Sequence, residues 1–393
     1  MRFAAILLSF AATFSASLGC ATPFTPANEA DVLEQLPYKP NDPVLRELRQ
    51  LRADLLRQPN DLKAALRLAR RYYEMVSEEG DPRYLGYAQA ALAPWWSLPS
   101  PPVAVLVLRA SIHQYRHDFD AALADLSQAI KLNPRNAEAW SLRAAINIVQ
   151  ARYQQGRQDC MGLHGLTSDL IMQACISTVD GLTGRLAQGY EALRNSLENS
   201  PRGTTDEKLW VFTRLAEMAQ RMGQSELAEG YFKQALALGK IDGFLLAAYA
   251  DFLLDHNRPA EVVPLLKGMN RSDILLLRLA LAEKALGIPD AVKHQADMQA
   301  RFDAARLRGD KVHRQEEARF TLYFLKSPAA ALKLAAENWE VQRESRDARI
   351  FMEAALAAND AQAALPAVAW VAQNHVEDAY LIKLANQVKA LNK

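Results

Sequence analysis

The chain has 393 residues, of which half are hydrophobic and 23% are charged, a composition typical of a folded, core-forming protein. Its 46 lysines and arginines nearly balance its 45 aspartates and glutamates, so no strongly basic surface predicts binding to nucleic acid or to an anionic membrane. The length suits either two ordinary domains or one elongated repeat array, and the pattern along the chain must decide between them.

Residues 1–21 have the features of a signal peptide. Arg2 supplies a short basic region, residues 4–18 are largely apolar, and Gly-Cys-Ala follows at 19–21. We expect cleavage after this segment and export to the periplasm or the medium. Residues 17–20, Ser-Leu-Gly-Cys, also resemble a bacterial lipobox with serine in place of leucine, so an outer-membrane lipoprotein lipidated at Cys20 is the alternative. No later segment predicts a membrane span, so we expect membrane attachment only through that lipid.

Two cysteines remain beyond the leader, Cys160 and Cys175. In an oxidising compartment such a pair predicts a disulfide, which would stabilise the fold by about 3 kcal/mol. Two buried free thiols are the alternative. His164 is the only nearby histidine, and a zinc site needs four ligands, so no metal is expected here.

The pattern after the leader predicts an all-α protein. Residues 22–45 are rich in proline and are interpreted as an extended N-terminal arm. From residue 46 to 393, alanine and leucine dominate, while proline and glycine fall between the helical stretches. Val, Ile and Thr do not gather into alternating strands.

Residues 103–136 form a 34-residue unit that ends in Leu-Asn-Pro-Arg-Asn. Small and large packing residues are spaced through it, and a proline ends its second helix: Ala110, Ala122, Leu126, Ala129 and Pro134. Two helices approach closely only where alanine replaces a larger residue, and proline cannot continue a helix. With its 34-residue period, the unit resembles the tetratricopeptide repeat.

Similar units recur along the chain, beginning from Ala137 (with Gly156 where alanine is usual) and also at 62–96, 170–203, 209–242, 243–269, 273–306, 318–339 and 348–374. The resemblance therefore implies a superhelical solenoid of tetratricopeptide-type helix pairs over residues 46–393, looser from about residue 270 onward.

The resemblance also implies a function, because the first helix of each pair lines the concave side in this family. We expect a protein or peptide partner to bind there. The predicted groove residues are Arg70, Tyr73, Gln114, Tyr115, Trp210, Arg221, Phe244 and Asp251. The alternative for the aromatic members is simple packing between pairs. The Lys/Asn clamp of chaperone-tail-binding members is absent.

Candidate chemistry is confined to one cluster. His113 and His117 lie four residues apart, with Asp118 next, so a helix could present them as metal ligands. A capped, hydrogen-bonded pair of histidines is the simpler interpretation, and no nucleophile elbow, zinc helix or phosphate loop occurs. The sequence thus predicts a non-catalytic binding scaffold of the bacterial cell envelope, without cofactor or metal. The alternative is a metal-dependent or accessory enzyme subunit that uses these three residues.

Overall fold

The computed structural model describes residues 28, 42–79, 81–310 and 312–392. The signal peptide, Cys20 and most of the proline-rich arm lie outside these residues. Contacts divide the chain into two units, residues 1–49 and residues 50–393. The described part of the first unit contains the start of α1 (Pro43–Arg57), which begins inside the range assigned to the arm. The following description concerns the second unit.

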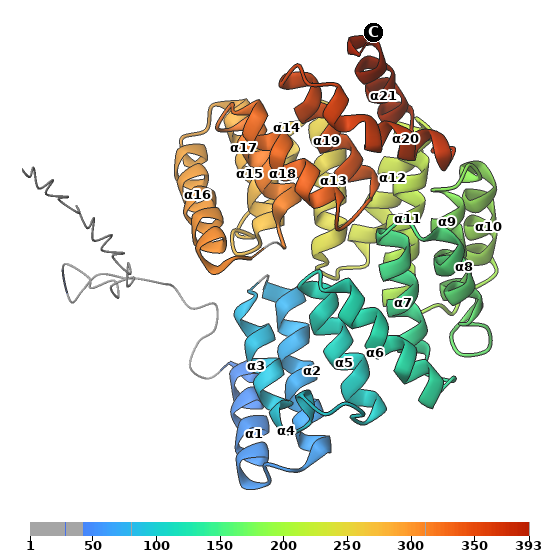
Figure 1. The fold of residues 1–393 in the computed structure, drawn as a ribbon, viewed down its shortest axis with the longest axis vertical. Helices are drawn as coiled ribbons and strands as arrows, with labels where there is room; N and C mark the ends of the chain where they lie inside the picture. Colours follow the sequence, from blue (N-terminus) through green and yellow to red (C-terminus); the bar gives the residue numbers. More distant parts are fainter. Residues whose placement is uncertain (1–27, 29–41, 80, 311, 393) are drawn as a thin grey trace, which may run out of the picture. The chain divides into compact units, whose positions relative to one another are not determined.

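The second unit is built from helices, and its described residues contain no β-strand, which confirms the all-α prediction (Figure 1). Consecutive helices pack against each other in pairs. The pairs are α2 (Leu62–Glu79) with α3 (Arg83–Ala91) and the short α4 (Ala93–Trp96), α5 (Val103–Tyr115) with α6 (Phe119–Leu132), α7 (Ala137–Val149) with α8 (Tyr153–Met161), α9 (Asp169–Asp180) with α10 (Leu186–Glu198), α11 (Thr205–Arg221) with α12 (Ser225–Ala237), α13 (Gly243–Asp255) with α14 (Pro259–Leu266), α15 (Asp273–Leu286) with α16 (Asp290–Arg308), and α17 (Arg314–Tyr323) with α18 (Pro328–Trp339). The chain ends with α19 (Ser345–Ala357), a 3₁₀ segment (Gln362–Ala364), α20 (Leu365–Gln373) and α21 (Ala379–Leu391).

From α5 onward, one residue with a left-handed backbone conformation (positive φ) lies in the turn after the first helix of each pair. Glycine adopts this conformation without strain because it has no Cβ, whereas other residues adopt it at a cost in conformational energy. Asparagine tolerates the conformation better than most, but histidine, alanine and lysine also occupy it. The residues are His117, Ala151, Gly184, Gly223, Asn257, Gly287, Lys326 and Asn359.

The predicted packing positions are buried. Ala110, Ala122, Leu126 and Ala129 are all fully enclosed between α5, α6 and their neighbours. The equivalent residues of α11 and α12, such as Ala216 and Phe232, are buried as completely. The repeat register read from the sequence is therefore the register of the fold.

An ion pair also repeats at the same period. Arg109 of α5 contacts Asp125 of α6 at 2.6 Å, and Arg143 of α7 contacts Asp159 of α8 at 2.7 Å. Each residue of the second pair lies 34 positions after its counterpart in the first. Both pairs join the two helices of one repeat, where the charges are shielded from water and their geometry is fixed.

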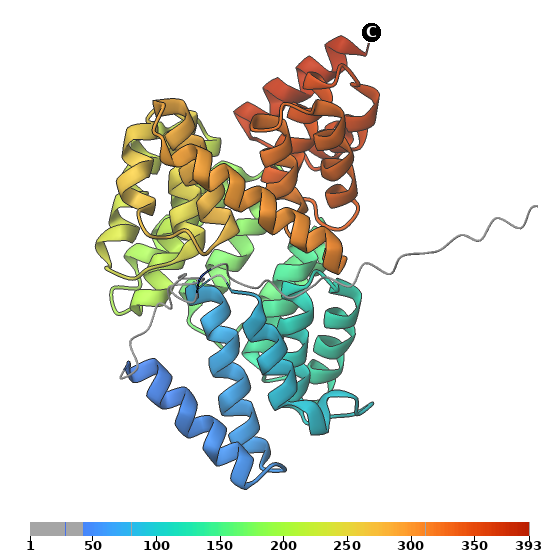
Figure 2. The ribbon, with the colours of Figure 1, turned by 90° about the vertical axis from the view of Figure 1, so that its left-hand side faces the viewer.

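The C-terminal helices fold back on the middle of the array (Figures 1 and 2). Apolar residues of α18 to α21 share one core cluster with residues of α7 to α9. Trp370 donates through its Nε1 to the Tyr153 hydroxyl at 3.1 Å, and the backbone N–H of Leu186 donates to Glu377 at 2.6 Å. The N–H of Arg343 donates to the carbonyl of Val149 at 2.7 Å. These residues are up to 217 positions apart in sequence.

Two glycines in this part of the chain allow close approaches. A Cβ on Gly156 would lie 2.9 Å from Ile148, and one on Gly184 would lie 2.8 Å from the Cβ of His375. Helices and turns come closer here than alanine would permit.

None of the helices within the described residues is both long and apolar enough to cross a membrane.

Candidate functional site

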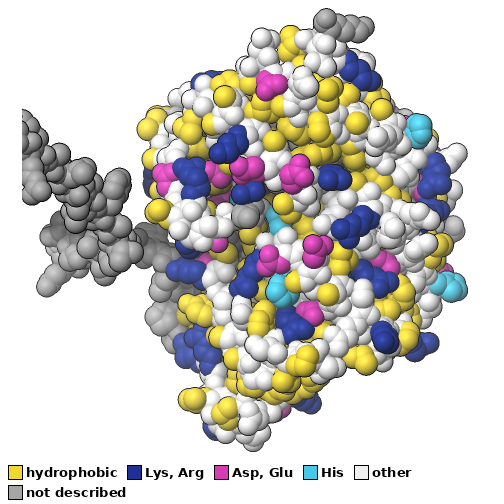
Figure 3. All heavy atoms as spheres, viewed as in Figure 1, with side chains coloured by type: hydrophobic (Ala, Val, Ile, Leu, Met, Phe, Trp, Pro, Cys, Tyr) yellow, Lys and Arg dark blue, Asp and Glu magenta, His cyan; other side chains and the backbone are white. Residues whose placement is uncertain are grey.

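A cavity of about 840 Å³ lies on the concave side of the central pairs. The first helices α7, α9, α11 and α13 form one side of it, and the segment before α19, α19 itself and the start of α21 form the other. The C-terminal helices therefore turn an open groove into a partly enclosed site. On the face seen in Figure 3, acidic and basic side chains lie next to one another across the middle of the molecule.

One wall of the cavity is apolar. It is made by α7 and α9 with the turns that follow them, and by Trp210 of α11; the other members include Ala145, Ile148, Val149, Ile171 and Leu182. Trp210 packs against both the core cluster that holds α7 to α9 and the cluster that holds α11 to α13. Small residues at Ser141 and Ala145 leave room where a larger side chain would fill the groove.

A second part of the lining, on α13, α15 and α19, is ionic. Asp251 of α13 accepts hydrogen bonds from Arg278 at 2.6 Å and from Arg319 at 2.7 Å. Burial disfavours the charged carboxylate, but the two guanidinium charges outweigh that effect and hold the pKa of Asp251 well below its usual range. The carboxylate therefore stays ionised and joins α13, α15 and α17.

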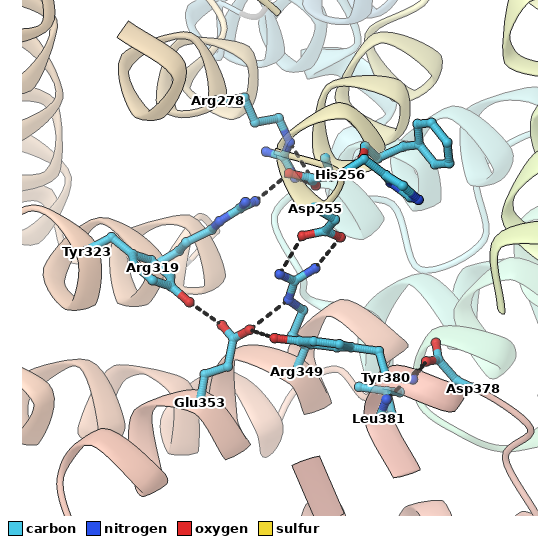
Figure 4. Close-up of polar contacts among 12 residues, drawn as sticks. Asp255, His256, Arg278, Arg319, Tyr323, Arg349, Glu353, Asp378, Tyr380 and Leu381 are labelled. Carbon is cyan, nitrogen blue, oxygen red and sulfur yellow. Dashed lines mark hydrogen bonds and ion pairs between the residues drawn. The ribbon is translucent and has the colours of Figure 1, made fainter. Parts of the chain in front are cut away.

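A second network surrounds Arg349 of α19 (Figure 4). Its guanidinium donates to both oxygens of Asp255, at 2.7 and 2.8 Å, and its Nε donates to Glu353 at 2.8 Å. Glu353 also accepts from the hydroxyls of Tyr323 and Tyr380, at 2.8 and 2.9 Å. Burial and the nearby Glu353 charge raise the pKa of Tyr380 to about 12, so its hydroxyl remains a donor. This network connects α13 to α17, α19 and α21.

Phe244, at the start of α13, is a partly exposed aromatic ring of the cavity, with 38% of its surface accessible. The guanidinium of Arg214 lies over this ring at 4.3 Å and contacts Glu217 at 3.0 Å. The N-terminus of α13 that presents the ring is fixed by Asp242, which accepts from the Leu245 N–H at 2.8 Å. An aromatic ring held beside a guanidinium is a typical anchor for a protein ligand.

Four of the predicted groove residues line this cavity, namely Trp210, Arg221, Phe244 and Asp251. Asp251 is already engaged by two arginines, so it builds the wall and is not a vacant contact.

The four groove residues predicted from the N-terminal pairs lie elsewhere. Arg70 is exposed on α2 and contacts Glu138 at 3.3 Å. Tyr73 and Tyr115 are half-buried, and burial, together with nearby acidic charges, raises the pKa of each to about 12. Gln114 is half-buried on α5. None of these four residues lines the cavity.

The histidines of the alternative metal site have different neighbours. The His113 ring lies 5.7 Å from the Trp96 ring in a tilted arrangement, with its Nδ1 3.5 Å from Asp118. His117 has a left-handed backbone conformation in the turn and stacks on Phe119 at 5.3 Å. Burial, helped by His313, lowers the pKa of His117 to about 4. Among the residues that the structure describes, no group of three or more His, Cys, Asp or Glu side chains is placed to hold a metal ion.

Cys160 of α8 and Cys175 of α9 form a disulfide, with Cα atoms 5.5 Å apart. Both side chains are buried, and Cys175 also lines the cavity. The bond joins the second helix of one pair to the first helix of the next, as the repeat register predicted. It therefore fixes two helices on the apolar side of the site.

Several residues of the site were not anticipated from the sequence, above all Arg278, Arg349 and Tyr380. Apart from Glu353 beside Arg349 and the Ile274 carbonyl beside Arg278, their partners lie 27 or more positions away on other helices. A repeat pattern aligns each pair with its neighbours, so it carries no signal for contacts between distant pairs.

Solved structures of similar proteins share this architecture. One is a tetratricopeptide repeat protein from Parabacteroides merdae, with 14% identity, coverage of 65% of this chain and 91% of that chain, and a TM-score of 0.43. The fold is that of a tetratricopeptide-type array. The match to yeast Tom70 covers 89% of this chain and 86% of that chain at 10% identity and a TM-score of 0.41. PilW, a type IV pilus biogenesis factor, covers 60% and 94% at 19% identity and a TM-score of 0.36. No protein-family model matches the sequence, and no curated protein matches it.

Proposed function

We propose that the protein is a non-catalytic binding scaffold of the bacterial cell envelope, and that its central cavity holds a peptide segment of a partner protein. The observation that carries this proposal is that one part of the cavity lining is apolar and another part is ionic. Trp210 and the α7–α9 residues offer apolar contact, Phe244 and Arg214 offer a ring beside a guanidinium, and α13 and α19 contribute ion pairs. A peptide has both kinds of surface, apolar side chains and a polar main chain.

The dimensions of the site support a short peptide. Pockets that enclose small ligands have volumes of roughly 300–1,000 Å³, and this cavity of about 840 Å³ lies at the upper end. Its lining comes from the first helices of five pairs (α7, α9, α11, α13 and α15) and from the C-terminal segments. One ligand would therefore touch several repeats at once. Contact with successive repeats is the usual advantage of a solenoid surface.

Export is part of the same proposal, and two independent features support it. The leader at residues 1–21 has the composition of a signal peptide, and the Cys160–Cys175 disulfide suits an oxidising compartment. Intact-mass measurement of the native protein tests this part. A mature chain that starts at Thr22, or an acylated Cys20, agrees with export, whereas an unprocessed Met1 contradicts it.

Site-specific photocrosslinking in the native host tests the binding role. A photoreactive phenylalanine analogue replaces Phe244 in the cavity, and a matched variant carries the analogue at Val292, which is 75% exposed on α16. We expect a discrete crosslinked product from position 244 and none of the same mass from position 292. Equal products from both positions, or none from position 244, would contradict a binding role for the cavity.

A further inference from the structure

The charges that line the cavity do not fully compensate one another. Six arginines and five carboxylates contribute to the lining. Four carboxylates each contact an arginine of the same lining: Glu217 with Arg214, Asp251 with Arg278, Asp255 with Arg349, and Glu344 with Arg346. The fifth, Asp378, caps α21 by accepting from the N–H groups of Tyr380 and Leu381. Arg221 and Arg343 are the arginines left over.

These two side chains make only weak contacts with the protein. Arg221 donates to the carbonyl of Gly181 at 3.5 Å, and Arg343 donates through Nε to the carbonyl of Trp339 at 3.3 Å. Within the described part of the chain, neither guanidinium has a carboxylate at ion-pair distance. Each guanidinium carries five N–H donors, so most of these donors are unused. Both groups thus have capacity for a ligand.

Both arginines belong to the same end of the cavity. The N–H of Arg343 is fixed to the carbonyl of Val149, at the end of α7, and Arg221 reaches the turn after α9 at Gly181. Both charges also act on the hydroxyl of Tyr153: burial raises the pKa of Tyr153, and the charges of Arg221 and Arg343 oppose that rise. Val149 and Leu182 of the apolar wall lie beside them.

We propose that Arg221 and Arg343 bind a carboxylate of the peptide in the cavity, so that the ligand is an acidic peptide with an apolar residue next to its acidic group. The proposal rests on the proposed function and adds the chemistry of the partner. The guanidinium fork matches a carboxylate with two parallel hydrogen bonds. The neighbouring apolar wall would receive the adjacent side chain.

A selection from a random hexapeptide library, with both peptide ends blocked, tests this ligand class. The full-length mature protein is the target, and the compared variants are Arg221→Gln with Arg343→Gln, and Arg202→Gln as the control. Arg202 lies on an exposed loop outside the cavity. We expect the wild type and the control to enrich peptides with Asp or Glu beside an apolar residue. The double variant should bind the best of these peptides at least tenfold more weakly and bind their Asn or Gln analogues as the wild type does.

The outcomes separate this inference from the proposed function. Enriched peptides without acidic residues would leave the binding role intact and overturn the acidic ligand. Unchanged affinity in the double variant would overturn the assignment to Arg221 and Arg343. A library that yields no binder would overturn both proposals, as would tight binding of laurate in place of any peptide.

Comparing free and amidated C-termini on an enriched peptide distinguishes a terminal carboxylate from a side-chain one. Replacement of both arginines by lysine should recover part of the affinity, because the charge returns without the fork.

Discussion

The pairs α5–α6 and α7–α8 are successive copies of one repeat, yet their concave sides differ. Both contain the same ion pair at the same register, Arg109–Asp125 and then Arg143–Asp159. Ser111 of α5 is 2% exposed, whereas Ala145, its counterpart 34 residues later, lines the central cavity. Position within the repeat therefore fixes how a residue packs inside its own pair. The neighbours that other parts of the chain supply decide whether its concave side is filled or hollow.

The N-terminal pairs have aromatic residues among their predicted groove positions. Tyr73 and Tyr115 are half-buried, and burial together with nearby acidic charges raises the pKa of each phenol to about 12. The central pairs place small residues at Ser141 and Ala145, and α19 to α21 cover the resulting space from the other side. The cavity thus depends on the C-terminal helices, and the following predictions, from the largest effect on stability to the smallest, test that dependence.

Trp370 should be the most sensitive position of the C-terminal cover. It is 5% exposed, meets Trp339 edge-on at 5.7 Å and donates to Tyr153. We expect Trp370→Ala to lower the free energy of unfolding by about 3–5 kcal/mol, because a large buried ring is lost. Tyr87→Ala, a half-exposed ring on α3, should cost about 1 kcal/mol or less. Urea unfolding of both variants makes the comparison; a similar small loss at both positions would mean that the cover adds little stability.

The disulfide should have the next largest effect. It closes a 15-residue separation, for which the loop-entropy model predicts about 3 kcal/mol. We expect the Cys160→Ser, Cys175→Ser double variant to unfold at a lower temperature than the wild type. A reducing agent should lower the wild-type midpoint and leave that of the variant in place. If the reductant lowers both midpoints equally, the bond does not stabilise the apolar wall.

His117 should make stability depend on pH in the N-terminal part of the array. Burial and His313 lower its pKa from 6.5 to about 4, while Glu316 and Glu344 favour its charged form and Arg346 opposes it. Between those two values the unfolded chain binds more protons than the folded one, so stability falls as pH decreases from 6.5 towards 4. We expect a loss on the order of 2 kcal/mol from this group.

The matched variant for this prediction is His117→Asn, since asparagine accepts the left-handed backbone of the turn and does not titrate. Denaturant titrations at several pH values between 4 and 7 should give a smaller pH dependence for the variant than for the wild type. Parallel curves would show that the ring does not contribute to the loss of stability.

Phe244 should affect stability least. Its ring is 38% exposed, so Phe244→Ala should change the thermal midpoint by little, equivalent to about 1 kcal/mol or less. The same change should weaken binding of a peptide that occupies the cavity by about tenfold, because an aromatic anchor beside Arg214 is lost. A strongly destabilised variant would assign the ring to the core and remove it from the proposed site.

The sequence predicted the local part of this structure well. The spacing of Ala110, Ala122 and Leu126 reported which faces of two helices must approach, and all three residues are buried as that spacing requires. The disulfide pairing followed from the two cysteines that remain beyond the leader. These features depend on neighbours within about one repeat, which a periodic pattern describes.

The fold-back of the C-terminal helices could not be predicted in this way. The contacts Trp370–Tyr153 and Glu377–Leu186 join residues 217 and 191 positions apart, and no periodicity relates them. The groove residues were consequently assigned as if the array were open throughout. Tyr73 and Tyr115, assigned in this way, do not line the cavity, and the assumption missed Arg349 and Tyr380, which complete the cavity from the other side.

The Trp370–Tyr153 and Gly184–His375 contacts have a consequence for how this chain can change over evolutionary time. An open solenoid can gain or lose a repeat anywhere, because each repeat touches only its neighbours. Here, inserting or deleting one repeat between α9 and α20 would shift the C-terminal helices away from α7 to α9 and leave Trp370 without its partner. The number of repeats in that span is therefore fixed by geometry, while repeats added before α5 would leave these contacts in place. Insertions among homologues should accordingly concentrate at the N-terminal end.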